Sequence, residues 1–127
     1  MLSYAFSEVD MPAIVTSGGG AGDATSVTLI RGGLWALDVD YGTADGTTVL
    51  TVSIVGGAAD GTDRTILVTA ASNTDGLRHP RFATTKAADG TAGTGEEVIG
   101  IAGRKIKVAA ASAGSTKTIT VRLIILQ

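Results

Sequence analysis

The side chains that most often do chemistry are sparse in this sequence and form no recognisable set. His79 is the only histidine, and the chain contains no cysteine. A Ser–His–Asp mechanism also needs a positioned serine, and no Gly-x-Ser-x-Gly pattern occurs. A zinc site built on His79 would need two or three carboxylates beside it, which is an uncommon ligand set. The sequence therefore predicts no catalytic residue and no enzymatic activity.

Three aspartates, Asp38, Asp40 and Asp45, lie close together and invite a calcium interpretation. An EF-hand loop that began at Asp38 would need Glu at its twelfth position, where this chain has Val49. Asp38 and Asp40 share one face of a predicted strand, so we interpret them as solvated side chains. An adventitious cation among the Asp-Gly turns is the alternative. We expect no metal and no cofactor.

A small basic group is the first candidate for a binding surface. Arg78, His79 and Arg81 lie close together, and Lys105 and Lys107 add positive charge on the polar side of a predicted hairpin. Complementary charge steers and orients protein association. We therefore interpret these residues as a docking patch for an acidic protein surface, with ordinary solubility as the alternative.

Composition narrows the class of protein. The 127 residues suffice for one domain with a core. A formal net charge of −2 argues against nucleic-acid binding, which needs a basic field. No stretch approaches the roughly 20 apolar residues of a membrane helix, and the N-terminus lacks the basic start of a signal peptide. We expect a protein that is made in a cytoplasm and inserts into no membrane.

Strands rather than helices are predicted throughout. Apolar residues alternate with polar ones at period two, and no window repeats them at helical spacing. Trp35 shares a predicted face with Leu37 and Val39, so we expect it to be buried. Residues 104–127 are expected to form a hairpin whose second strand is the longest and lies centrally. The other predicted strands span residues 25–31, 34–41, 48–55, 64–70, 78–85 and 97–101.

Repeated turn signals join these strands. Ala-Asp-Gly-Thr occurs at residues 44–47, 59–62 and 88–91. Asp can bond nearby backbone amides and Gly accepts positive φ, so each copy predicts a tight turn. About eight short antiparallel strands with such turns are typical of a β-sandwich, and eight suit a jelly roll. The predicted fold class is an all-β, antiparallel, jelly-roll-like sandwich.

The first 23 residues are predicted to be an arm with a glycine-rich linker, followed by the sandwich at 24–127. The run Ser-Gly-Gly-Gly-Ala-Gly-Asp at residues 17–23 has the composition of a flexible linker. We interpret the segment as an arm or a loosely tied first strand that could pair with its own domain or a neighbour's, and a frayed terminus is the alternative. Its candidate contact residues are Met11, Pro12, Ile14 and Val15.

Apolar residues are also expected on outer faces. Ile124 stands on the otherwise polar side of the last strand, and mean hydropathy is +0.33. Exposed apolar patches mark partner surfaces more often than defects. We therefore expect a homo-oligomer or docking to another protein.

Four segments in the second half of the chain carry a resemblance to a known family. They are residues 65–76 (TILVTAASNTDG), 78–81 (RHPR), 101–108 (IAGRKIKV) and 117–126 (KTITVRLIIL). With them, roughly residues 60–127 resemble the capsid decoration, or cement, proteins of tailed bacteriophages, which have a jelly-roll fold. The resemblance implies a protein on the exterior of a virion, bound to the major capsid protein as a dimer or trimer and stabilising the head. The predicted arm would then clamp neighbouring capsid subunits, so deleting residues 1–22 should weaken capsid binding and leave the fold intact.

Two other functions are consistent with the sequence. A glycan- or receptor-binding module of a virion fibre would need a groove lined by aromatic side chains, and a buried Trp35 would weaken that hypothesis. A hydrolase would need convergent carboxylates with perturbed pKa values in a cleft.

Overall fold

The computed structural model describes residues 5–85 and 92–127, except for the side chains of residues 82–97. The described chain contains strands and turns and no helix. The strands are β1 (Phe6–Asp10), β2 (Ile14–Val15), β3 (Gly22–Thr25), β4 (Ile30–Asp40), β5 (Val49–Ile54), β6 (Arg64–Val68), β7 (Gly76–Arg78), β8 (Arg81–Thr85), β9 (Ala92–Arg104), β10 (Ile106–Ala111) and β11 (Thr118–Leu126).

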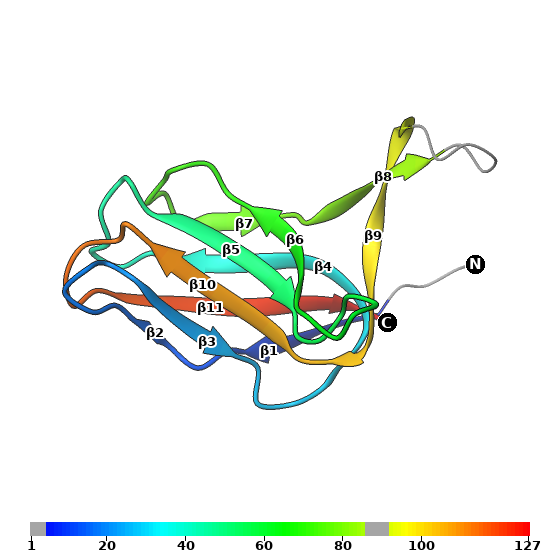
Figure 1. Cartoon of the computed structure of the whole chain (residues 1–127), viewed down its shortest axis with the longest axis horizontal. Helices are drawn as coiled ribbons and strands as arrows, with labels where there is room; N and C mark the ends of the chain where they lie inside the picture. The colour runs from blue at the N-terminus through cyan, green and yellow to red at the C-terminus, as the bar shows by residue number, and fades with distance from the viewer. Residues whose placement is uncertain (1–4, 86–91) are drawn as a thin grey trace.

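Two antiparallel sheets pack face to face as a sandwich (Figure 1). The seven-stranded sheet has the order β1-β11-β4-β9-β8, with β2 also paired to β11 and β7 to β4. The four-stranded sheet has the order β3-β10-β5-β6. The chain crosses between sheets from β3 to β4, from β4 to β5 and from β10 to β11, which is the alternation of a jelly roll. The predicted fold class is confirmed.

The structure has more strands than the predicted number of about eight, mainly because local signals divide some of the predicted strands. Pro80 separates β7 from β8 within the predicted strand at 78–85, since proline cannot donate to a ladder. Only Ile30 and Arg31 of the predicted strand at 25–31 belong to β4, which continues through the predicted strand at 34–41 as far as Asp40. The turns at 44–47 and 59–62 form as predicted; Asp60 accepts a hydrogen bond from the Thr62 amide at 3.0 Å. The third copy, at 88–91, lies outside the described residues.

The C-terminal pair of strands is not a hairpin, which corrects the prediction. β10 pairs with β3 and β5, whereas β11 pairs with β1, β2 and β4 in the other sheet. The connection between them crosses the end of the core: Ala113 is buried, and its amide donates to the Gly20 carbonyl at 3.1 Å. β11 does have strand neighbours on both sides, but β9 is longer, with 13 residues.

The N-terminal segment belongs to the sandwich and pairs with its own chain. β1 and β2 pair with β11, and β3 pairs with β10. Met11 is 5% exposed and Ile14 is 0% exposed, so both lie in the core, while Pro12 and Val15 face outward. The Ser17 amide donates to the Ala21 carbonyl at 2.9 Å, which makes the glycine-rich run a closed turn. The arm and linker predicted for residues 1–23 differ from this arrangement, because inward apolar side chains and open ladder positions on β10 and β11 draw the segment in.

The core between the sheets is mainly aliphatic, with Tyr41 as a buried aromatic side chain. Burial of each large aliphatic side chain contributes about 1.5–3 kcal/mol. The largest fully buried side chains are Tyr41, Ile14, Leu34, Leu37, Leu50, Ile99, Ile106, Ile119, Leu123, Ile125, Val39 and Val52. Because the core takes the inward residues of every long strand, the outward residues are free to form surfaces.

Candidate binding face

Three strands that are distant in sequence lie side by side in the seven-stranded sheet and bring charged groups together. The register places Asp10 of β1 opposite Arg122 of β11, and Arg122 opposite Asp38 of β4. Arg122 donates from Nε to Asp10 Oδ1 at 2.8 Å and from Nη1 to Glu8 Oε2 at 3.3 Å. These contacts join residues that are more than a hundred positions apart, so only the sheet topology creates them.

The carboxylates outnumber the guanidinium. We use the name acidic cluster for Glu8, Asp10, Asp38 and Asp40, which surround Arg122. The hydrogen bond to Asp10, followed by the negative charges of Asp10 and Glu8, raises the pKa of Arg122. The guanidinium therefore stays charged and neutralises one carboxylate, so the cluster keeps a net negative charge.

A shallow depression of about 220 Å³ lies within this cluster. Its lining residues are Asp10, Asp38, Asp40, Thr120 and Arg122. Carboxylates accept hydrogen bonds, a guanidinium donates them and a threonine hydroxyl does both. The depression can therefore hold a cationic side chain or a group rich in hydroxyls.

A β-bulge turns Trp35 to this same outer side, which corrects the prediction that it is buried. In the pairing of β4 with β11, Ala36 lies opposite Ile124 and Leu34 lies opposite Ile125. Trp35 is therefore the extra residue of a bulge, which reverses the alternation at that point. Leu37 is buried as predicted, whereas Trp35 is only half-buried.

Trp35 joins an aromatic cluster, which we define as Phe6, Trp35 and His79. The Phe6 and Trp35 rings are 5.3 Å apart at 69°, and the Trp35 and His79 rings are 5.0 Å apart at 87°. Such edge-to-face pairs are favoured by the ring quadrupoles. Phe6 remains 53% exposed. Phe6 and Asp10 are outward residues of one strand, roughly 13 Å apart at the usual rise, so the two clusters form one surface, the acidic–aromatic face.

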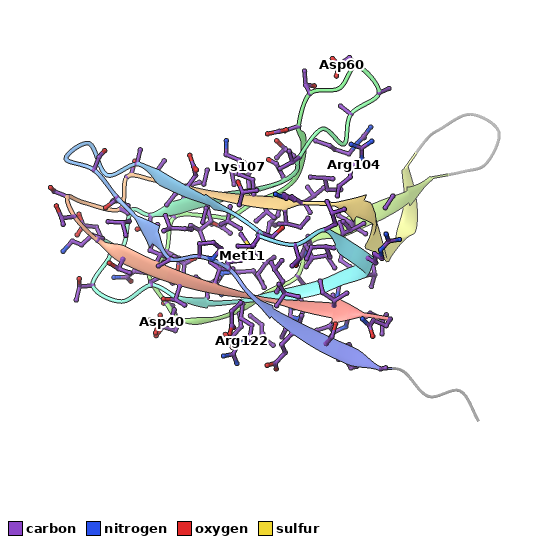
Figure 2. All side chains as sticks on the ribbon, turned by 90° about the horizontal axis from the view of Figure 1, so that it is seen from below. Met11, Asp40, Asp60, Arg104, Lys107 and Arg122 are labelled. Atoms are coloured by element: carbon purple, nitrogen blue, oxygen red, sulfur yellow. The ribbon has the colours of Figure 1, made fainter. Side chains whose placement is uncertain are left out.

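The predicted basic docking patch does not form one surface. Lys105 and Lys107 are in or next to β10 of the four-stranded sheet, whereas Arg78, His79 and Arg81 lie beside β4 of the other sheet. Figure 2 shows Lys107 on the opposite side of the molecule from Asp40 and Arg122.

The arginines of this group are held by the backbone. Arg78 Nη2 donates to the Thr74 carbonyl at 2.7 Å, and its guanidinium lies 5.6 Å from the centre of the Tyr41 ring. Arg81 Nη1 donates to the Trp35 carbonyl at 2.7 Å. Among the predicted patch residues, His79 alone contributes a ring to the acidic–aromatic face, and Arg81 helps to hold the backbone of its central tryptophan.

Some of the face carried a sequence signal that was missed. Phe6, Glu8 and Asp10 alternate with Ser7 and Val9, which is the period of a strand with one polar face. Nothing local in the sequence marks the bulge.

Other kinds of site are not found in the described part of the chain. Among the described side chains, those of residues 5–81 and 98–127, no three from His, Asp or Glu are arranged to hold a metal ion. Among the same residues, no helix is long and apolar enough to cross a membrane.

Comparisons with known proteins identify no family. No family model and no curated protein matches the chain. An exo-β-1,3-galactanase from Phanerochaete chrysosporium with bound galactose is similar at TM-score 0.35 and 15% identity, over 99% of this chain and 30% of the enzyme chain. The infectious bursal disease virus Gt strain structure is similar at TM-score 0.26 and 17% identity, over 97% of this chain and 39% of the viral chain. The chain spans well under half the length of either protein, and likenesses at these TM-scores carry no argument about function.

Proposed function

We propose that this chain is a structural protein of a virus head that docks on the outer surface of the capsid through the acidic–aromatic face. The observation that carries the proposal is the outward Trp35 beside the acidic cluster. Exposed aromatic side chains are typical anchors of protein interfaces, and a charged rim gives orientation. The role needs no catalytic residue, cofactor or metal.

The net charge of the acidic–aromatic face indicates which side chains its partner on the capsid surface would carry. The acidic cluster keeps a net negative charge around Arg122, so it favours lysine and arginine side chains on the major capsid protein. A cationic side chain can also lie over the face of an aromatic ring such as Trp35. The basic patch predicted from the sequence would have favoured an acidic partner, but its residues lie on different sheets. The acidic–aromatic face instead favours a basic partner.

Attachment to a particle favours several linked contacts. If the chain is a dimer or trimer on the virion exterior, each subunit adds a binding event at high effective concentration. Exposed large apolar side chains outside the aromatic cluster supply surface for self-association. They are Val15, Val27, Leu29, Val68 and Leu77.

A glycan- or receptor-binding module is a second candidate, and the same observation favours it. Trp35 is not buried, and it shares a sheet surface with a depression lined by carboxylates, a hydroxyl and a guanidinium. A ring that packs on a sugar and polar groups that bind its hydroxyls are complementary requirements of such a site.

The first experiment mixes the purified chain with particles assembled from the major capsid protein of the same virus. We expect saturable co-sedimentation at a fixed ratio per capsid subunit. Asp38→Asn should weaken binding, whereas Asp23→Asn, the same change on β3 of the other sheet, should not. A chain that ignores the particles and instead binds glycans in a screen would replace the capsid proposal with the second candidate.

A further inference from the structure

A second surface lies on the opposite flank of the sandwich, where both sheets have an open edge. β6 is the last strand of the four-stranded sheet. In the other sheet, β9 pairs with β4 from Ile99 onward, while its pairing with β8 runs only from Ala92 to Val98. In the described part of the chain, no strand pairs with the outer edge of β6 or with this second half of β9 on its outer side, although β8 approaches β6. Both edges therefore offer backbone groups that an added strand could pair with.

Between these edges lies a cleft of about 170 Å³. Its lining residues are Ile54, Gly57, Arg64, Gly100, Ala102 and Arg104. Ile54 and Ala102 supply its apolar atoms, and the two arginines come from different sheets. Figure 2 places Arg104 on the far side of the sandwich from Asp40 and Arg122, so the cleft is separate from the acidic–aromatic face.

Both guanidiniums reach the connection between β5 and β6. Arg64 donates from Nε to the Gly57 carbonyl at 3.3 Å. A Cβ placed on Gly56 would lie 3.2 Å from Arg104 Nη1, so this guanidinium sits against the same loop. These backbone contacts leave further N–H donors on each arginine, because a guanidinium carries five.

The nearby carboxylates are engaged elsewhere. Asp63 accepts from the Gly56 amide at 2.9 Å, and Asp60 accepts from the Thr62 amide and hydroxyl at 3.0 and 2.6 Å. Among the side chains that the structure describes, every ion pair belongs to Arg122. The cleft therefore presents two positive groups without a carboxylate partner from the described chain.

We infer that this two-arginine cleft binds a carboxylate side chain from an extended acidic segment of a partner protein, which lies beside β6 at its Arg64 end. A guanidinium fork matches the two oxygens of a carboxylate, so two forks favour an acidic side chain over a neutral one. The edge of β6 supplies main-chain hydrogen bonds, and the charged cleft selects the side chain. The inference does not rest on the capsid proposal.

The test titrates the full chain with an end-capped hexaglutamate peptide and, separately, with inorganic phosphate, followed by calorimetry and by NMR of the backbone amides. We expect the peptide to bind and to shift the amides of β6. The double variant Arg64→Gln/Arg104→Gln should weaken peptide binding at least tenfold. Lys117→Gln, which removes one positive charge in the connection between β10 and β11, should change it less than twofold.

A further variant tests the space inside the cleft separately from the charge of its arginines. A Cβ placed on Gly100 would have no other heavy atom within 4 Å, and the φ of this glycine is not positive, so Gly100→Val can fill the cleft and keep both arginines. We expect it to weaken peptide binding as well. Equal losses in Lys117→Gln and the double variant would overturn the site, as would unchanged binding in Gly100→Val. Phosphate that binds as tightly as the peptide would overturn the choice of an extended segment.

Discussion

The two outer faces of the sandwich are built by the same alternation but carry different chemistry. The face of the four-stranded sheet exposes small or isolated polar groups, such as Thr51, Ser53 and Ala109 on β5 and β10. The face of the seven-stranded sheet carries an acidic cluster, an arginine and an outward tryptophan. The strand scaffold is thus shared, and the outward residues of one sheet distinguish the surface that we assign to binding.

The largest expected effect concerns the buried core between the two sheets. Ile14→Ala should lower the free energy of unfolding by about 2–5 kcal/mol, because Ile14 is fully buried between the sheets. Val15→Ala, the outward neighbour on β2, should change it by less than about 0.5 kcal/mol. Urea unfolding of both variants measures the difference. Similar, small losses in both would mean that the segment is the loose arm expected from composition.

Deleting residues 1–22 should therefore abolish the fold rather than release an arm. The deletion removes β1 and β2, two ladder partners of β11, together with Met11 and Ile14. Far-ultraviolet circular dichroism and hydrodynamic size would check this. A compact, cooperatively melting product would contradict the packing described for the N-terminal strands.

The next effect distinguishes the two faces directly. Trp35→Ala should weaken the proposed capsid association by about tenfold or more, because aromatic anchors contribute about 2 kcal/mol or more at interfaces. Lys107→Ala on the opposite sheet should leave it within about twofold. Co-sedimentation with assembled particles measures both, and thermal melting confirms that each variant is folded. Equal weakening would remove the distinction between the faces.

A smaller effect concerns the charge of the acidic cluster. Association with capsids should slow by about threefold to tenfold between roughly 0.05 and 0.5 M salt, because screening shortens the range of electrostatic steering. Asp38→Asn should show a shallower salt dependence than the unmodified chain. Stopped-flow association rates at several salt concentrations check this, and parallel salt curves would exclude steering by the cluster.

The smallest effect lies in a turn that belongs to neither face. Hydrogen bonds from the Thr62 side chain and then its amide lower the pKa of Asp60 from its usual 3.8. A lowered folded-state pKa stabilises the protein above the unfolded value, and that stability is lost as the pH falls through the folded value. Asp60→Asn should therefore melt slightly lower than the unmodified chain at pH 7, and the difference should shrink below pH 3.8. A constant difference would assign the effect to something other than ionisation.

The sequence by itself determined the class of fold and much of the core. Period-two alternation places Leu37, Val39 and Leu123 inside, and Asp-Gly places the turns at 44–47 and 59–62. These signals are local, because side-chain direction in a strand and the backbone preference of a turn depend on a few neighbouring residues. Local information was therefore sufficient for them.

Tertiary structure decided which strands pair and which outward residues meet. The connection between β10 and β11, which was expected to be a hairpin turn, joins strands of opposite sheets. Lys107 and Arg122 therefore lie on opposite sides of the sandwich. The β-bulge at Trp35 turns the side chain of this tryptophan outward. The contact of Glu8 with Arg122 requires strands from both ends of the chain. Pairing and register depend on the combined burial and hydrogen bonding of distant segments, so the local period cannot specify them.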